Sequence, residues 1–386
     1  MAAATPPFEA QTLGGEVFVG PIVSLDAGRI TIGTAEGPVS LPTDDLMTVC
    51  LKAEPTPASP EPDVWVRLVD GSLLAAQQIT VEGGRARITL DDGPIVELST
   101  AGIAAVRLQG QSEVVAAEWS RILDMKIDAD LLVVRRGEIV DYHKGVLHNV
   151  TDALVQFELD GDVLPVSRSK VHGLVYYHPA GEALPETLCR ITEAGGSQWS
   201  VHRLALPGEL QWTTRGGLTV SRPLAMITRM DFSGGKVVYL SDLKPESVRF
   251  TPYFGTERDV PVLGEFRAVR MDVNLGSDPL QLGEKQYGKG LALHSRTRIV
   301  YRLPERFRRF KAVVGIDDGV RPHGHVRLVI HGDEKLLLDI ALSGTDPPKP
   351  VDLDLGGVRR LAILIDFGDG LDVADHLDLC SARIIK

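Results

Sequence analysis

The feature that most constrains this chain is a rhythm of short strands that recurs four times between residues 14 and 232. Each copy alternates apolar and polar residues, as in Arg85 to Leu90, and turns at glycine-containing pairs such as Asp70-Gly71 and Arg136-Gly137. Alternation puts every second side chain on one face, which a curled sheet must bury. About five short strands in about 45 residues predict a small β-barrel, in which closure removes the exposed edges.

The repeats therefore predict an all-β chain that begins with four barrel-like segments. Their rhythm resembles that of Sm-like barrels, although no fingerprint residue is present. A proline-rich stretch, residues 53–62, predicts an extended linker between the first two segments. The predicted domains are residues 1–52, 63–111, 112–178 and 187–237, followed by a different segment, 238–386.

One helix is predicted among these strands, from Ser112 to Lys126. Ser112 can cap its first turn, and the apolar residues that follow recur at helical spacing on one face. Among them, Val115, Trp119 and Ile122 are expected to pack across a seam between barrels.

Composition and charge exclude several classes of protein. A net charge of −11 argues against nucleic acid as a partner, because phosphates require a basic surface. No apolar run approaches the roughly 18 residues of a transmembrane helix, so no membrane span is predicted. The three cysteines lie far apart and match neither a disulfide framework nor a metal site.

The first residues, MAAATPPFEAQ, are similar to the region just after a signal-peptidase cleavage site. They predict an exported protein, periplasmic or extracellular, whose signal peptide has been removed. A native cytoplasmic start is the alternative interpretation.

The sequence changes character after Val238, and a series of motifs follows in a fixed order. These motifs are Lys289-Gly290-Leu291, His294-Ser295, Tyr301, Phe310 to Gly315, Asp317-Asp318, Pro350-Val351, and Asp375-His376 with Asp378. Their order and spacing resemble the NPCBM family, the "novel putative carbohydrate-binding module" of bacterial exported proteins. The resemblance implies a galactose-binding-like jelly-roll β-sandwich that binds a glycan at its loop end.

Two positions depart from the family pattern. The aspartate-glycine of one hairpin is reversed to Gly332-Asp333, and Leu379 stands where the family has tryptophan. Sugars commonly stack on aromatic rings, and all four tryptophans lie in the barrel segments. Stacking in the C-terminal segment would therefore require Tyr, Phe or His.

The polar residues of these motifs are the candidates for a binding site. His294 could bond a ligand hydroxyl or satisfy a buried loop. Asp317 and Asp318 could chelate a sugar diol or a structural calcium ion, which prefers oxygen ligands, or could form an Asp-Gly turn. No other cofactor is predicted. The candidates are His294, Asp317, Asp318, Arg321, His323, Asp375, His376 and Asp378.

Three functions are compatible with this pattern. The first is a non-catalytic protein that binds a galactose-type glycan, with the barrels as spacer or second surface. The second is an envelope scaffold with protein partners that has lost sugar binding, an interpretation that Leu379 favours. The third is a glycoside hydrolase or its accessory, which would need two carboxylates about 5–9 Å apart. The sequence contains no nucleophile elbow, P-loop, His-Glu-x-x-His or dinucleotide motif.

Overall fold

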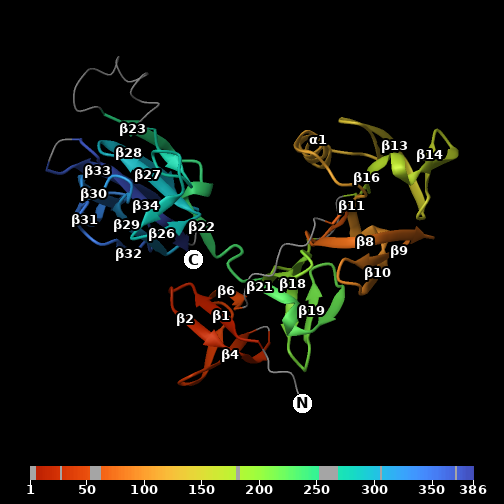
Figure 1. Cartoon of the computed structure of the whole chain (residues 1–386), viewed down its shortest axis with the longest axis horizontal. Helices are drawn as coiled ribbons and strands as arrows, with labels where there is room; N and C mark the ends of the chain where they lie inside the picture. Colours follow the sequence, from red (N-terminus) through yellow and green to blue (C-terminus); the bar gives the residue numbers. More distant parts are fainter. Residues whose placement is uncertain are drawn as a thin grey trace. The chain divides into compact units, whose positions relative to one another are not determined.

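The computed structural model describes residues 6–26, 28–52, 62–179, 183–251, 268–304, 307–369 and 372–386. The chain divides into two compact units, Met1–Gly234 and Gly235–Lys386 (Figure 1). Both are built almost wholly of strands, and the described residues form a single α-helix, as predicted. The predicted linker at residues 53–62 lies outside the described residues apart from Pro62.

The strands of the N-terminal unit follow the four sequence segments. The first segment forms β1 (Phe8–Thr12), β2 (Val17–Gly20), β3 (Ile22–Leu25), β4 (Arg29–Thr34), β5 (Gly37–Pro42) and β6 (Leu46–Leu51). The second forms β7 (Val64–Leu68), β8 (Leu73–Glu82), β9 (Arg85–Leu90), β10 (Ile95–Ser99) and β11 (Ile103–Arg107). The third forms β12 (Asp130–Arg136), β13 (Ile139–Val150), β14 (Leu154–Leu159), β15 (Asp162–Ser167) and β16 (Val171–Val175). The fourth forms β17 (Cys189–Glu193), β18 (Gln198–Ala205), β19 (Leu210–Thr214), β20 (Thr219–Arg222) and β21 (Ile227–Asp231).

One pairing order recurs in the second, third and fourth segments. The first four strands pair in chain order, a short 3-10 turn follows the fourth strand, and the fifth strand pairs with the first, as β11 does with β7. Strand β8 shifts register between Ala76 and Gln78, which lets one long strand pair with both β7 and β9. In the first segment β1 pairs with both β2 and β6, and β3, β4 and β5 form a separate sheet.

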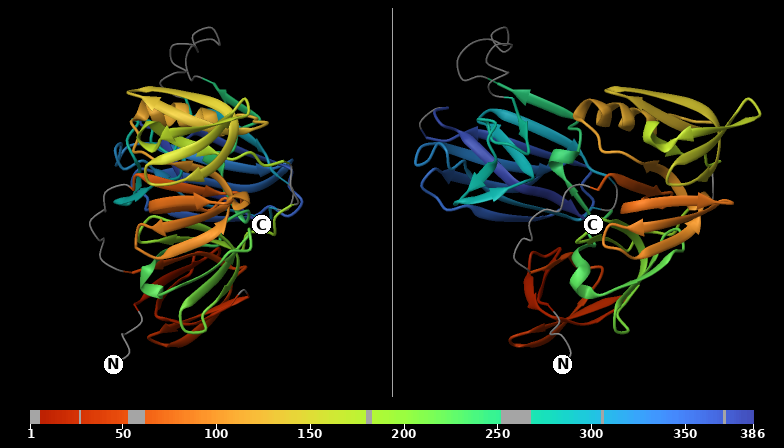
Figure 2. Two further views of the ribbon diagram at one scale, coloured as in Figure 1. Left: turned by 90° about the vertical axis from the view of Figure 1, so that its right-hand side faces the viewer. Right: turned by 45° about the vertical axis from the view of Figure 1, so that its right-hand side comes forward.

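The last strand of each segment also pairs with the last strand of another segment. Strand β11 pairs with β16, and β6 pairs with β21. Figure 2 accordingly shows the second segment beside the third, and the first beside the fourth. Because the four segments share sheets and one continuous apolar core, the unit is compact as a whole. The predicted boundaries between four separate barrel domains stay a prediction.

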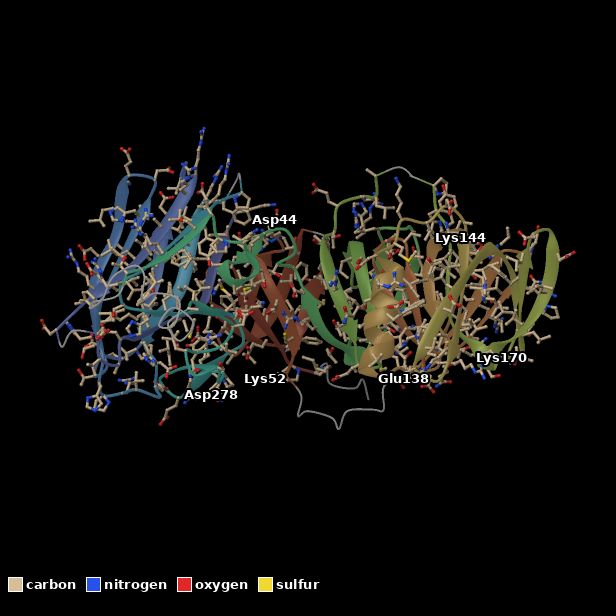
Figure 3. All side chains as sticks on the ribbon, turned by 90° about the horizontal axis from the view of Figure 1, so that it is seen from above. Asp44, Lys52, Glu138, Lys144, Lys170 and Asp278 are labelled. Carbon is tan, nitrogen blue, oxygen red and sulfur yellow. The ribbon has the colours of Figure 1, made fainter. Side chains whose placement is uncertain are left out.

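The helix α1 (Glu113–Leu123) is slightly shorter than predicted and has the predicted cap. Ser112 Oγ accepts the Val115 N–H at 3.4 Å and donates to Glu138, which lies beside α1 in Figure 3. On its apolar face Trp119 and Ile122 pack on side chains of β11, β12 and β16. The helix therefore covers the seam where β11 and β16 meet, as the sequence predicts.

The C-terminal unit is a sandwich of two sheets, as the motif series predicts. One sheet has the order β24-β27-β34-β29-β32, with β22 also paired to β34, and the other has the order β23-β28-β33-β30-β31. The first sheet contains β22 (Val237–Tyr239), β24 (Arg270–Met271), β27 (Gly290–His294), β29 (Arg309–Ile316), β32 (Lys349–Asp354) and β34 (His376–Ile385). The second contains β23 (Ser247–Phe250), β28 (Thr297–Arg302), β30 (His325–Gly332), β31 (Lys335–Ser343) and β33 (Arg360–Phe367). A hairpin of β25 (Leu280–Leu282) and β26 (Lys285–Tyr287) packs on the outer face of the first sheet.

Leu379, the position that departs from the family pattern, lies inside this sandwich. Its side chain is fully buried in the apolar core between the two sheets. A larger ring at this position would pack in the core and would not be available to a ligand at the surface. The absence of tryptophan here is therefore no reason to favour the scaffold function over sugar binding.

Candidate functional site

The sheet register brings three of the predicted residues into one row. His294 ends β27 and lies directly opposite His376, which begins β34. Asp317 follows β29 on the other side of β34, and its N–H donates to the His376 carbonyl at 3.0 Å. Because Leu293, Leu377 and Ile316 on the same strands face the core, the alternation of side chains turns this row to the outer face.

A pocket of about 430 Å³ opens at this row. The His294 and His376 ring centroids are 5.9 Å apart, and Phe250 meets the His294 ring edge-on at 6.3 Å. His294 is buried, whereas Val373 exposes 70% of its surface. The pocket is lined by Leu275, Gly276, His294, Asp372, Val373, Ala374 and His376. It thus combines two imidazoles, a carboxylate and an exposed apolar side chain.

Two buried carboxyl groups lie next to the row. Asp378 is completely buried on the same face of β34, beside the Asp317 carboxylate. Burial, together with the neighbouring Asp317, raises the pKa of Asp378 to about 9, so this carboxyl is protonated at neutral pH. Asp375 is also buried and accepts the His325 N–H at 3.1 Å; burial raises its pKa as well. Through this hydrogen bond Asp375 ties the loop before β34 to the start of β30.

Asp317 and Asp318 anchor loops through backbone and amide donors. Asp317 accepts the Gly319 N–H at 2.8 Å, the Asp-Gly turn that the sequence allowed, and Asn274 Nδ2 at 3.1 Å. Asp318 accepts the N–H groups of residues 283 and 284, at the turn of the β25–β26 hairpin.

A calcium ion at Asp317 and Asp318 would have to displace some of these donors, because all four carboxylate oxygens accept an N–H. Among the described residues, no group of three or more His, Cys, Asp or Glu side chains is arranged to hold a metal ion. Calcium binding by this pair stays a prediction.

The last two candidates lie in the loop after Asp318, and neither lines the pocket. Arg321 donates to the carbonyls of Gly344 and Asp346 at 2.7 and 2.9 Å and thereby ties two loops together. His323 is exposed on the same loop.

The pocket also contains residues that sequence reasoning missed. Leu275 and Gly276 precede the motif series, and Asp372 to Ala374 precede Asp375 in a loop without periodicity. The one local signal is the short Asn274 to Asp278 turn, in which Asn274 Oδ1 accepts two backbone N–H groups. Neither segment has a residue pattern that points to a ligand.

Comparison with known proteins identifies the C-terminal unit. Residues 236–385 match the sequence model of the NPCBM/NEW2 domain. The match places an NPCBM/NEW2 domain in the C-terminal unit. No curated protein matches the chain, and within the described residues no helix has the length and apolar character needed to cross a membrane.

Three solved structures are among those to which the chain is similar. The CBM51 of Clostridium perfringens GH95 in complex with methyl-galactose is 20% identical, covers 38% of this chain and 99% of its own, and has a TM-score of 0.33. The CBM51-2 and INT domains of Clostridium perfringens ZmpB, with GlcNAc, are 21% identical over 48% of this chain and 37% of theirs, with a TM-score of 0.34. The tandem CBM51 modules of Sp3GH98, the family 98 glycoside hydrolase of Streptococcus pneumoniae SP3-BS71, are 15% identical over 83% of this chain and 88% of theirs, with a TM-score of 0.32.

Proposed function

We propose that the NPCBM/NEW2 domain binds a galactose-type glycan in the pocket between His294 and His376, without catalysing a reaction on it. Membership of the family supports carbohydrate binding. The observation that supports this location is the directly opposed pair of histidines on the outer face of the sheet. We propose further that the protein is exported and presents this site to glycans outside the cytoplasm.

The pocket offers the contacts that a sugar needs. Imidazole nitrogens both donate and accept, so they can bond neighbouring hydroxyl groups. The apolar C–H face of a sugar can pack on a ring or on the exposed Val373 side chain. Gly276 lines the pocket without a side chain.

The His376→Ala variant tests this proposal. Because His376 lines the pocket, the variant should weaken binding of methyl-galactose by at least about tenfold. The measurement is titration calorimetry of the full chain with methyl-galactose, fucose and N-acetylglucosamine.

The matched control is His331→Ala, which removes an imidazole from β30 in the other sheet and should leave binding unchanged. If the His376→Ala variant and the unsubstituted protein bind the sugar with equal affinity, the binding site does not include His376. If none of the three sugars binds, the proposal of glycan binding by this domain is wrong.

A further inference from the structure

The N-terminal unit contains a second pocket, of about 270 Å³, beside helix α1. Its lining is rich in aromatic, cationic and hydrogen-bonding side chains. The lining residues are Trp65, Arg67, Leu73, Ala105, Arg107, Gln111, Trp119, Ser120 and Leu123. None of the sequence motifs described above points to this place.

Strand register explains why these residues meet. On β7 and β11, Trp65 lies opposite Arg107 and Arg67 lies opposite Ala105, so all four share the face that α1 partly covers. The helix forms one wall of the pocket through Trp119, Ser120 and Leu123. Trp119 is held close to the sheet because Gly173 of β16, beneath its ring, has no side chain. A Cβ atom at Gly173 would lie 2.6 Å from the Trp119 ring.

The charge of the pocket is opposite to that of the chain. Both charged residues that line it are arginines, whereas the whole chain has a net charge of −11. Arg107 is buried, with its guanidinium carbon 5.9 Å from the Trp65 ring centroid, and it donates to the Pro62 carbonyl at 3.2 Å. Arg67 is exposed, and no described residue forms an ion pair with it.

We propose that this pocket binds the acidic sugar residue of a glycan, one that carries a carboxylate on a pyranose ring. The planar guanidinium of an arginine can form two parallel hydrogen bonds with a carboxylate, so Arg67 would bind the carboxylate of the sugar. The Trp65 indole packs against the ring C–H groups, and Gln111 and Ser120 bond hydroxyls. The volume is below that of pockets for drug-sized ligands, so it suits one sugar residue. This site is separate from the proposed function of the C-terminal unit and makes the N-terminal unit a second binding surface.

Titration of the full chain with galacturonic acid tests the proposal, with galactose as the neutral analogue. The protein carries His376→Ala, which reduces the contribution of the C-terminal pocket to the measured binding. Galacturonic acid should bind with a millimolar Kd that increases as salt is added, and galactose should bind more weakly than galacturonic acid. Arg67→Ala should raise the Kd for galacturonic acid at least tenfold. The Kd of Arg67→Lys should lie between that of Arg67→Ala and that of the protein with Arg67.

Two further variants locate the site. Arg87→Ala removes an exposed arginine of the same segment, paired with Glu97 outside the pocket, and should leave the Kd unchanged. Trp65→Phe keeps an aromatic wall, so galacturonic acid should still bind while the change in tryptophan emission on binding is reduced.

Three results would overturn the proposal. They are no binding of galacturonic acid at about 20 mM, an unchanged Kd in Arg67→Ala, and tighter binding of a peptide with a free C-terminal carboxylate than of its amide and of galacturonic acid. The last result would identify the ligand as a protein terminus. Because Arg67 lies in the N-terminal unit, the comparison of Arg67→Ala with the unsubstituted residue reports on this pocket and not on the C-terminal one.

Discussion

Replacing Arg222 with methionine is expected to lower the free energy of unfolding of the N-terminal unit by about 3–5 kcal/mol. Arg222 Nε donates to Glu193 Oε1 at 2.9 Å, and the two side chains are only 9% and 2% exposed. The other carboxylate oxygen accepts Trp199 Nε1 at 2.7 Å. Methionine fills much of the same space but leaves the buried Glu193 carboxylate with the indole N–H as its remaining side-chain partner. The cost is that of a buried charge without its counter-ion.

The loss should depend on pH. Burial already raises the pKa of Glu193, and Arg222 opposes that rise. Without Arg222 the pKa of the folded state rises further above that of the unfolded state, so the folded protein binds the extra proton more strongly. Stability then falls as pH increases, and the deficit of Arg222→Met should shrink between pH 8 and pH 5. Adding Glu193→Gln, which keeps an acceptor for Trp199, should recover part of the loss at pH 8.

Tryptophan emission is the measurement for this unit, because all four tryptophans lie before residue 235. Urea unfolding followed by emission therefore reports the N-terminal unit selectively. The matched control is Arg229→Met, which removes an exposed partner of Asp231 in the same segment and should cost less than about 1 kcal/mol. Equal losses of unfolding free energy in Arg222→Met and Arg229→Met would show that burial of the Arg222–Glu193 ion pair does not determine the size of the effect.

Much of the fold was predictable because it depends on local patterns. Alternation from Arg85 to Leu90 specifies a strand that the structure contains as β9. The helix begins after Ser112 because one side chain satisfies a free N–H, a property that can be recognised from neighbouring residues alone. The joining of β11 to β16 could not be predicted in this way, because an edge-to-edge pairing leaves no periodic signal in either strand.

The candidate site was predictable only in part, for a similar reason. The motifs identify His294 and His376, but only the register of β27 on β34 places the two rings on one face. Residue type did not reveal how deeply a side chain is buried, so Asp378 was a candidate ligand contact although it lies fully buried on the same face of β34 as His376. The rim residue Val373 comes from an irregular loop, where neither charge nor spacing marks a function.

The buried carboxyl of Asp378 leads to the second large expected effect. Its folded-state pKa of about 9 lies far above the ordinary value near 4, so the folded protein holds a proton that the unfolded chain releases at neutral pH. The C-terminal unit should therefore lose stability as pH rises from 5 to 8, by at most about 1.4 kcal/mol per pH unit. Asp378→Asn cannot ionise and should lack this slope, which makes it more stable than the unsubstituted protein by about 2–4 kcal/mol at pH 8.

Calorimetric unfolding of the full chain at several pH values measures this effect. The transition of the C-terminal unit is the one that tryptophan emission does not follow, since that unit contains no tryptophan. Asp278→Asn, at an exposed position of the same unit, controls for the loss of a carboxylate and should keep the slope of the unsubstituted protein. Parallel pH curves for Asp378→Asn and the unsubstituted protein would mean that Asp378 is ionised in the folded state. That result would place a second negative charge beside Asp317.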